Sequence, residues 1–405
     1  MKYDSIDLTG LAHRLVAARK AANVTQDAAA KYLNMSRPTF IGIEKGMRRP
    51  RPEELVKLAE LYKVPLNKLL RDDSRPAQVR PHLRSVVDMS PEGLREREEA
   101  VALLSAYIDD YQYLEKLVEA KAITQFPLPV RIPPGPIERF AEHCAQEERA
   151  RFNLGAHQPI YPLRSVLEEA GVHIFIDKLD SKLAGLYVFV PEFGYCILVN
   201  RVHRRERRRW TIAHEYGHFL ADRDRPGVDF LRPMQRKSEG ERFADSFAAA
   251  FLMPEAGIHR RFYEEVERSG DFKVGDLCRM ADYFAVSLMA MALRLESLGL
   301  IPRGSWDQIC ESRVPVRHLK QEAGIQPPQD DDSLDPYPKR YKLLAVQAFV
   351  DEKITEGQLA KFLRCSRIQA REIVAQYSET ADDGDGIQSL VPLSLTDSLL
   401  ADAAK

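Results

Sequence analysis

The sequence predicts a mainly α-helical protein with a small β-sheet, an α+β fold made of several domains. At 405 residues the chain exceeds one ordinary domain. Apolar residues recur at intervals of three and four through most of the chain, which is the spacing of amphipathic helices. Only three short stretches, residues 172–176, 184–190 and 195–200, have the β-branched or alternating character of strands. We divide the chain into segments 1–75, 76–135, 136–300, 301–378 and 379–405.

The composition is that of a globular protein, since 44% of residues are hydrophobic and 29% are charged. No run approaches the roughly 20 apolar residues of a membrane-spanning helix, and the first residues lack the apolar core of a signal peptide. The five cysteines are scattered, which argues against a disulfide framework or a cysteine metal site. We therefore expect a cytoplasmic protein without a membrane partner.

Charge is unevenly distributed along the chain. Residues 1–75 hold fifteen Lys and Arg against nine Asp and Glu, whereas the whole chain has a net charge of −1. The N-terminal segment is therefore basic and the rest of the chain is acidic. This distribution predicts that any surface that attracts nucleic acid is confined to the N-terminal segment.

The N-terminal segment is predicted to form five short helices, at about residues 11–22, 25–33, 36–46, 51–62 and 65–70. Ser36 caps the third helix, which carries Pro38 near its start. Asn34 precedes it and tolerates the left-handed conformation of a tight turn. Two short helices joined by such a turn in a basic segment predict a helix-turn-helix; the alternative is a generic small helical bundle.

This segment resembles the Cro/repressor-type (XRE) helix-turn-helix family over its whole length. The matching residues are Thr25-Gln26, Leu33 to Ser36, Ile43-Glu44, Gly46, Pro50, Leu55, Leu58-Ala59 and Val64-Pro65. The resemblance implies a five-helix, lambda-repressor-like domain that binds a double-stranded DNA operator as a homodimer.

In such a domain the start of the third helix faces the bases. We expect Arg37, Thr39 and Phe40 to reach base edges, Arg37 toward guanine and Phe40 or the Thr39 methyl toward thymine methyls. The remaining expected DNA-binding residues position the helix or contact phosphate: Gln26, Ser36, Lys45, Arg48 and Arg49. For each of them the alternative is an ordinary solvated side chain.

The connecting segment, 76–135, begins with a polar, proline-containing linker and continues as a long helix from Pro91 to about Ala122. Its apolar residues, spaced by three or four, suit either a short coiled-coil dimer seam or a face packed on the next domain. Closely spaced prolines then make residues 126–136 extended.

The stretch from Trp210 to Leu220 carries the clearest chemistry. His214 and His218 lie one helical turn apart, so both imidazoles can reach one ion, and Glu215 lies beside the first. This is the His-Glu-x-x-His arrangement of zinc peptidases. The alternative is a solvated helix face, but the flanking residues are apolar. Gly217 inside the helix also suggests that another backbone approaches closely there.

Residues 238–254 are predicted to form that approaching helix, with apolar residues at helical spacing and Pro254 after the end. Glu241 is the expected third metal ligand, since a catalytic zinc takes three protein ligands and a water. Asp245 is expected to accept the outer N–H of a ligating histidine. A helix-start carboxylate is the alternative, but Glu239 fits that role better.

The segment from about Pro136 to Leu300 resembles the ImmA/IrrE-type metallopeptidases. The matching residues are the run from Thr211 to His218, Glu241 with Asp245, Phe247-Ala248 to Met253-Pro254, and the stretch from Phe284 to Leu300. The resemblance implies a gluzincin-like fold with Zn²⁺, or Mn²⁺ in the cell, at His214, His218 and Glu241. It implies Glu215 as the water-activating residue and a regulatory DNA-binding protein as the substrate.

Around this motif we expect helices at residues 137–152 and 162–170, and a hairpin of strands 184–190 and 195–200. A substrate strand is placed at a sheet edge within this hairpin. The basic run 201–209 is interpreted as a solvated loop with paired arginines, a grip on substrate or DNA being the minor alternative. The residue that stabilises the oxyanion is left open among Tyr216, Arg201 and His203.

Beyond Leu300, an acidic, proline-rich break at residues 326–338 precedes helices at 341–351 and 354–378. Residues 355–373 have some helix-turn-helix character, but packing against the peptidase is the preferred role. Residues 379–405 are expected to be a disordered tail.

Two functions compete. The first is a DNA-binding transcriptional regulator with zinc-dependent endopeptidase activity that cleaves a repressor or related protein. The second is a non-proteolytic repressor or antitoxin that uses the zinc fold as a sensor or dimer platform. Self-cleavage in the linker near residues 75–84 is a third candidate, because the helix-turn-helix precedes the peptidase here. The operator, scissile bond and activating signal are not determined by the sequence.

Overall fold

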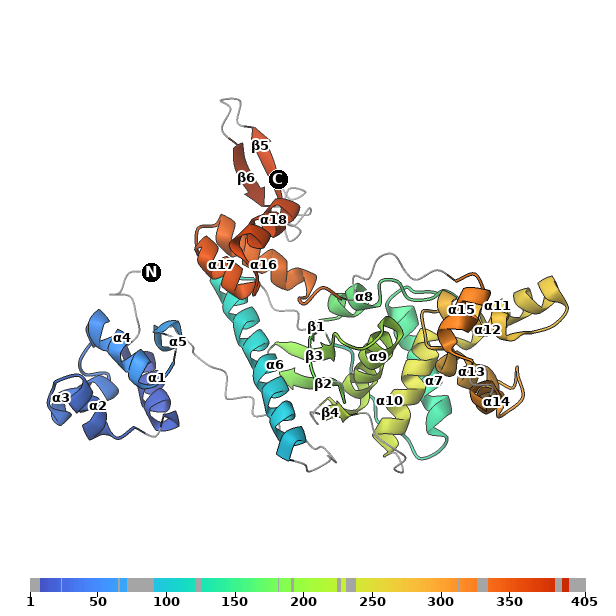
Figure 1. The fold of residues 1–405 in the computed structure, drawn as a ribbon, viewed down its shortest axis with the longest axis horizontal. Helices are drawn as coiled ribbons and strands as arrows, with labels where there is room; N and C mark the ends of the chain where they lie inside the picture. The colour runs from blue at the N-terminus through green and yellow to red at the C-terminus, as the bar shows by residue number, and fades with distance from the viewer. Residues whose placement is uncertain are drawn as a thin grey trace. The chain divides into compact units, whose positions relative to one another are not determined.

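The computed structural model describes residues 8–22, 24–64, 66–70, 91–120, 126–180, 182–190, 193–223, 227–230, 238–311, 314–325, 334–382 and 388–392. The chain forms two compact units, Met1–Val79 and Arg80–Lys405 (Figure 1). Helices dominate both units, as predicted. No helix among the described residues has the length and apolarity needed to cross a bilayer.

The first unit is the predicted five-helix module: α1 (Leu8–Ala21), α2 (Gln26–Tyr32), α3 (Arg37–Glu44), α4 (Pro52–Leu61) and α5 (Leu66–Leu70). The Thr25 side chain accepts a hydrogen bond from the Ala28 amide, and Ser36 accepts one from Thr39, so both helices of the central pair are capped. Asn34 has φ 53°, the predicted left-handed turn. The helix-turn-helix geometry therefore follows from local capping.

A four-stranded sheet is central to the second unit, with strands β1 (Val172–Asp177), β2 (Leu183–Val190), β3 (Gly194–Asn200) and β4 (Gly227–Phe230). Their order is β1-β3-β2-β4, with β1 parallel to β3 and β2 antiparallel to both of its neighbours. The predicted hairpin is confirmed. The placement of a free edge within it is wrong, because β3 lies between β1 and β2 and β4 pairs with β2.

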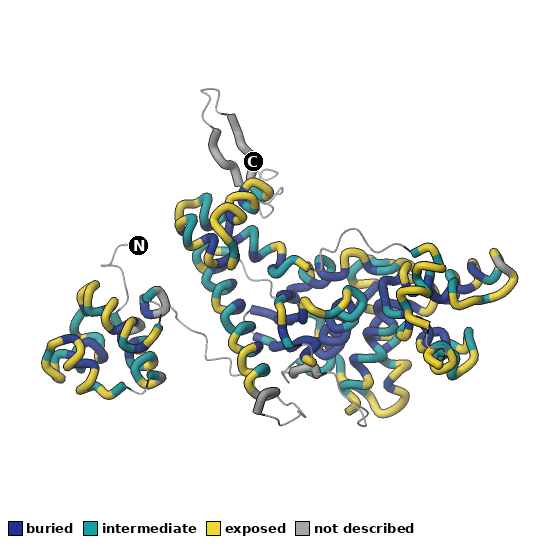
Figure 2. The backbone as a smooth tube through the Cα atoms, in the orientation of Figure 1, coloured by how far each residue is buried: buried dark blue, intermediate teal, exposed yellow. Residues whose placement is uncertain are grey.

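Both faces of the sheet are buried, so β1 to β3 are dark blue along most of their length (Figure 2). Along β3, Tyr195, Ile197 and Val199 face one core, whereas Cys196 and Leu198 face another. The first core is closed by α7 (Ile137–Arg151), α8 (Leu163–Glu169), α9 (Arg205–Asp222) and α10 (Glu239–Leu252), and continues into α11 (Glu255–Ser269), α12 (Val274–Tyr283) and α13 (Leu288–Ser297). The second core covers the opposite face of the sheet.

The long helix α6 (Pro91–Leu117) packs its apolar residues on this opposite face (Figure 1). Tyr107 and Tyr111 are fully buried, and the Tyr107 hydroxyl donates to Asp177 at the end of β1 (2.7 Å). Of the two interpretations of this helix, packing on the neighbouring domain is therefore correct. The face proposed as a dimer seam is already occupied.

The C-terminal helices divide between the two cores. Helices α14 (Ser305–Glu311) and α15 (Val316–Glu322) add side chains to the first core. Helices α16 (Lys339–Val350), α17 (Glu356–Phe362) and α18 (Arg367–Tyr377) complete the second, as predicted. The prediction of a disordered tail is wrong for β5 (Ser378–Asp382) and β6 (Gln388–Pro392), which pair antiparallel. The rest of that segment lies outside the described residues.

Candidate metal centre

Helices α9 and α10 bring three ligand side chains together. The Nε2 atoms of His214 and His218 are 3.2 Å apart. The Glu241 carboxylate lies 3.7 Å from the first and 3.9 Å from the second. Among the described residues this is the group of metal-ligating side chains that could hold an ion.

The spacing of these atoms fits a small divalent cation. Ligands about 2.0–2.1 Å from a tetrahedral zinc lie about 3.3 Å from one another, close to the histidine separation. The carboxylate oxygens are a few tenths of an ångström farther away, which a small side-chain movement would close. Two neutral imidazoles and one carboxylate also form a donor set typical of catalytic zinc.

A close helix crossing sets the position of Glu241. A Cβ atom added to Gly217 would lie 3.0 Å from the Ala244 Cα and 3.3 Å from the Phe247 ring. The predicted close backbone approach at Gly217 is therefore confirmed. Ser238 caps α10 by accepting a hydrogen bond from the Glu241 amide (3.3 Å). Glu241 thus occupies the first turn of α10, three residues before the crossing.

The outer nitrogen of each histidine faces an aspartate. The Nδ1 atom of His214 lies 3.0 Å from Asp245, the residue predicted to accept the outer N–H of a ligating histidine. Such a contact orients an imidazole with Nε2 toward the ion. The Nδ1 atom of His218 lies 3.9 Å from Asp222, which we did not predict. Its position four residues after His218 on α9 was the available signal.

The centre is buried beneath the sheet. His214 is 5% exposed, His218 7% and Glu215 0%. Tyr187 of β2 stacks on the His218 ring, with centroids 5.5 Å apart and planes 13° apart. Tyr195 of β3 donates to the Glu215 carbonyl (2.9 Å), and burial holds the pKa of this tyrosine well above its ordinary value. Both tyrosines were expected only as strand residues.

Tyr216, one of the three residues considered for the oxyanion, points away from the centre. Its hydroxyl donates to Glu148 (2.5 Å) and accepts from Arg151 (2.6 Å) on the α7 side. Burial and the neighbouring Glu148 carboxylate raise the pKa of Tyr216 well above its ordinary value. Tyr216 therefore supports the packing of α9 on α7.

Only the start of the basic run is the solvated loop that we expected: residues 201–204 precede the helix, and Arg201 and Arg204 are exposed. Helix α9 begins at Arg205, and Arg208 and Arg209 are buried at 4% exposure each. Arg209 donates to the carbonyls of Ala285 (3.1 Å) and Ile160 (2.9 Å). These arginines satisfy buried carbonyls and join α9 to neighbouring loops, which explains why cations occur at a helix start despite the dipole.

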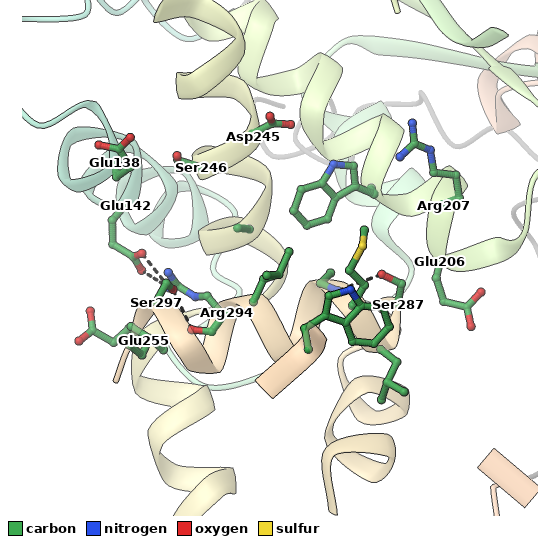
Figure 3. A pocket seen from close by; sticks show the side chains of 18 of the residues that line it. Glu138, Glu142, Glu206, Arg207, Asp245, Ser246, Glu255, Ser287, Arg294 and Ser297 are labelled. Atoms are coloured by element: carbon green, nitrogen blue, oxygen red, sulfur yellow. Dashed lines mark hydrogen bonds and ion pairs between the residues drawn. The ribbon is translucent and has the colours of Figure 1, made fainter. Parts of the chain in front are cut away.

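A cavity of about 930 Å³ lies beside the centre and includes Asp245 in its wall (Figure 3). Both tryptophans of the chain, Trp210 and Trp306, line it. Arg294 in the same wall donates to Glu142 (2.7 Å) and to the Met253 carbonyl (3.1 Å). None of the metal-ligating side chains is in its lining, and the cavity adjoins the centre through Asp245.

In the first unit the residues expected at the start and end of the DNA-facing helix separate into two groups. Ser36, Arg37 and Lys45 are exposed and Thr39 is partly exposed; Arg37 also lies 3.3 Å from Asp27 in an exposed ion pair. Phe40 is 0% exposed and packs in the core of the unit. The prediction that Phe40 contacts a base is wrong, because its ring holds α3 against the other helices.

Two of the expected phosphate contacts have intramolecular partners. The Gln26 amide donates to Glu44 (2.7 Å), and Glu44 also accepts from Arg19 (2.6 Å). Arg48 donates through both terminal nitrogens to Glu54 (3.2 and 2.9 Å). These bonds connect the α2–α3 pair to α1 and α4, and phosphate contact by either side chain stays a prediction.

Comparison with known proteins finds a matching family within each unit. Residues 167–296 match the IrrE N-terminal-like domain of the Peptidase M78 family. Residues 15–69 match the helix-turn-helix family. The chain is therefore a fusion of an XRE-type helix-turn-helix domain with an IrrE-type domain related to metallopeptidases.

No curated protein matches the chain. Among solved structures it is similar to the apo form of the competence regulator ComR from Streptococcus vestibularis, at 10% identity over 90% of this chain and 91% of that chain, with a TM-score of 0.15. ComR from Streptococcus suis is similar at 12% identity over 91% and 93%, also with a TM-score of 0.15.

Proposed function

We propose that this protein is a cytoplasmic DNA-binding transcriptional regulator with zinc-dependent endopeptidase activity toward a repressor or related regulatory protein. The observation that carries the proposal is the convergence of His214, His218 and Glu241, with Asp245 behind the first histidine. The helix-turn-helix domain on the same chain supports a role in transcription.

Each residue of the centre has a proposed task. A zinc ion held by the three ligands would polarise a water molecule and lower its pKa. Glu215, next to His214 on α9, is the general base that accepts the proton of the attacking water and returns it to the leaving amine. Asp245 positions His214. Tyr187, stacked on His218, restricts the second imidazole to one orientation.

The DNA-binding half of the proposal rests on the α2–α3 pair. An exposed α3 start with Arg37 suits entry into the major groove of a double-stranded operator. Binding as a homodimer to two half-sites stays part of the proposal, but it needs a surface other than the buried face of α6.

The decisive experiment uses the full chain loaded with Zn²⁺ or Mn²⁺. It is incubated with a lysate of its own cells, and new protein N-termini are identified by mass spectrometry, including any within residues 75–84 of the chain itself. Glu215→Gln should abolish the new termini. Glu239→Gln, an exposed carboxylate at the start of α10, should leave them unchanged. Equal cleavage by wild type and Glu215→Gln would refute the peptidase assignment.

The burial of Glu215 favours a second candidate function. A general base must meet water, yet Glu215 is 0% exposed in this structure. In the second candidate the centre is a sensor or structural platform of a non-proteolytic repressor or antitoxin. That function predicts operator binding and repression by Glu215→Gln at wild-type strength, with no new termini for either protein.

A further inference from the structure

The α17–α18 pair repeats the helix-turn-helix of the first unit. Seven of twenty positions are identical when residues 25–44 are aligned with residues 355–374. Helices α2 and α17 both have seven residues, and each follows a threonine, Thr25 or Thr355, whose side chain caps it. The two pairs therefore begin with the same local structure.

The turn between the helices is also repeated. Asn34 has φ 53° and Arg364, at the aligned position, has φ 46°. Two residues later a serine caps the next helix: Ser36 accepts from the Thr39 amide, and Ser366 accepts from the Gln369 amide, each at 3.3 Å. Ala285 (φ 50°) and the Ser287 cap of α13 form the same turn a third time, so the turn supports the alignment only together with the matching sequence.

Burial follows the same pattern in both pairs. Five aligned pairs of positions are buried in both: Ala29 and Leu359, Ala30 and Ala360, Leu33 and Leu363, Phe40 and Ala370, Glu44 and Val374. The side chains that fix the angle between the helices thus occupy equivalent places. The alignment describes three-dimensional structure as well as sequence.

The exposed side of α18 suits a nucleic-acid duplex. Arg367, Ile368, Gln369 and Arg371 are exposed, and Ile368 reaches 70%. From residue 356 to residue 372 the chain has four basic residues and two acidic ones, Glu356 and Glu372. Glu356, at the position of Gln26, is neutralised by Arg371 (2.8 Å). Arginine, glutamine and an apolar side chain are the types that read base edges in the major groove.

The inner side of the pair is held by the rest of the second unit. The Tyr341 hydroxyl of α16 donates to the Phe362 carbonyl (3.0 Å). The Arg364 guanidinium lies 3.8 Å from the centre of the Tyr107 ring of α6 and 3.7 Å from Asp110. Packing against the sheet domain therefore uses one side of the pair and leaves the start of α18 exposed.

We propose that α17–α18 is a second helix-turn-helix and that α18 binds double-stranded DNA. Arg367 contacts phosphate or guanine and Ile368 contacts a thymine methyl, while Arg371 stays paired with Glu356 and Gln369 closes the Ser366 cap. The chain then has two DNA-binding elements, one in each unit. This inference extends the DNA-binding half of the proposed function and is independent of peptidase activity.

The first experiment measures the affinity of the full chain for a 30-base-pair duplex of random sequence, by fluorescence anisotropy at low salt. Arg37→Glu removes a cation from the first element, Arg367→Glu removes the aligned cation from the second, and Arg303→Glu is the charge-matched control in an exposed turn. In the Arg37→Glu background, Arg367→Glu should weaken binding about tenfold further. It should also reduce, by about one, the slope of the logarithm of the binding constant against the logarithm of the salt concentration. Arg303→Glu should do neither.

The outcomes separate the two elements. If the first does not bind DNA, Arg37→Glu has no effect but Arg367→Glu still weakens binding. If Arg367→Glu behaves like Arg303→Glu in both backgrounds, the inference is overturned. Circular dichroism confirms that each variant is folded.

The second experiment places a photo-cross-linking amino acid at Ile368, and at Tyr263 of α11 as a control that is 54% exposed. Irradiation of the full chain with the duplex should label DNA from position 368 and not from position 263. Labelling of protein alone from position 368 would instead identify α18 as a protein-docking helix and overturn the inference.

Discussion

The crossing of α9 and α10 at Gly217 predicts that a single methyl group will disturb the metal centre. In Gly217→Ala the new Cβ would lie 3.0 Å from the Ala244 Cα, whereas carbon atoms in contact are ordinarily about 3.5–4.0 Å apart. Relief needs a movement of α10 of roughly 0.5–1 Å. Glu241 is one turn earlier on the same helix and should move with it.

The expected magnitudes separate stability from metal binding. Overpacking a buried contact costs about 1–3 kcal/mol, and alanine in place of helical glycine returns about 0.5–1 kcal/mol. The free energy of unfolding should therefore fall by only about 0.5–2 kcal/mol. Metal–ligand distances tolerate changes of only about ±0.2 Å. Displacement of Glu241 should therefore weaken Zn²⁺ binding by about 10–100-fold, the same loss that follows when a residue hydrogen-bonded to a metal ligand is removed.

The measurement is a competition titration of Zn²⁺ between the apo protein and a chromophoric chelator, alongside denaturant unfolding. Gly275→Ala in α12 is the matched control, because the nearest atom to its new Cβ is an arginine nitrogen 3.7 Å away. It should bind Zn²⁺ as wild type does and be slightly more stable. If Gly217→Ala behaves in the same way, the helix crossing does not position Glu241.

Three further predictions follow from named contacts. Asp245→Asn should weaken Zn²⁺ binding by about 10–100-fold and change the free energy of unfolding little. If this variant binds Zn²⁺ as tightly as the wild type in the chelator titration, Asp245 does not orient His214. Phe40→Ala should lower the free energy of unfolding of the first unit by about 3–5 kcal/mol. Phe40→Leu should keep the affinity for the operator, measured by fluorescence anisotropy below the melting temperature. A folded Phe40→Leu variant that loses this affinity would show that Phe40 contacts a base after all. Burial lowers the pKa of His173 on β1 from 6.5 to about 4, so the unfolded chain takes up its proton first as pH falls. The free energy of unfolding of the second unit should therefore decrease between about pH 6.5 and pH 4, by up to about 3 kcal/mol. The urea midpoint should fall less over this range in His173→Phe than in the wild type. An equal fall in both proteins would show that His173 does not cause the pH dependence.

Much of the first unit could be predicted from sequence because its structure is local. Threonine and serine caps, a left-handed asparagine and short amphipathic helices act within a few residues of one another. The error at Phe40 arose because sequence shows that a residue begins a helix but not which way its ring points. Only the packing of α3 against the other helices decides that.

The metal centre could be predicted in part. The four-residue spacing of His214 and His218 is a property of any helix, and the glycine between them indicated a close neighbour. The contributions of Asp222 and Tyr187 were missed. Tyr187 reaches His218 only because the sheet packs on α9, and no spacing along the chain encodes that contact.

By itself the sequence determined the modules, the two-histidine motif and the identity of the helix that carries Glu241, since each follows from short-range periodicity and side-chain chemistry. The tertiary structure decided which strand edges are covered, that the long helix packs on the sheet, and that α17–α18 keeps an exposed face. These outcomes depend on burying apolar surface between segments far apart in the chain. The free energy gained by this burial depends on the contacts of the assembled core and not on any one segment.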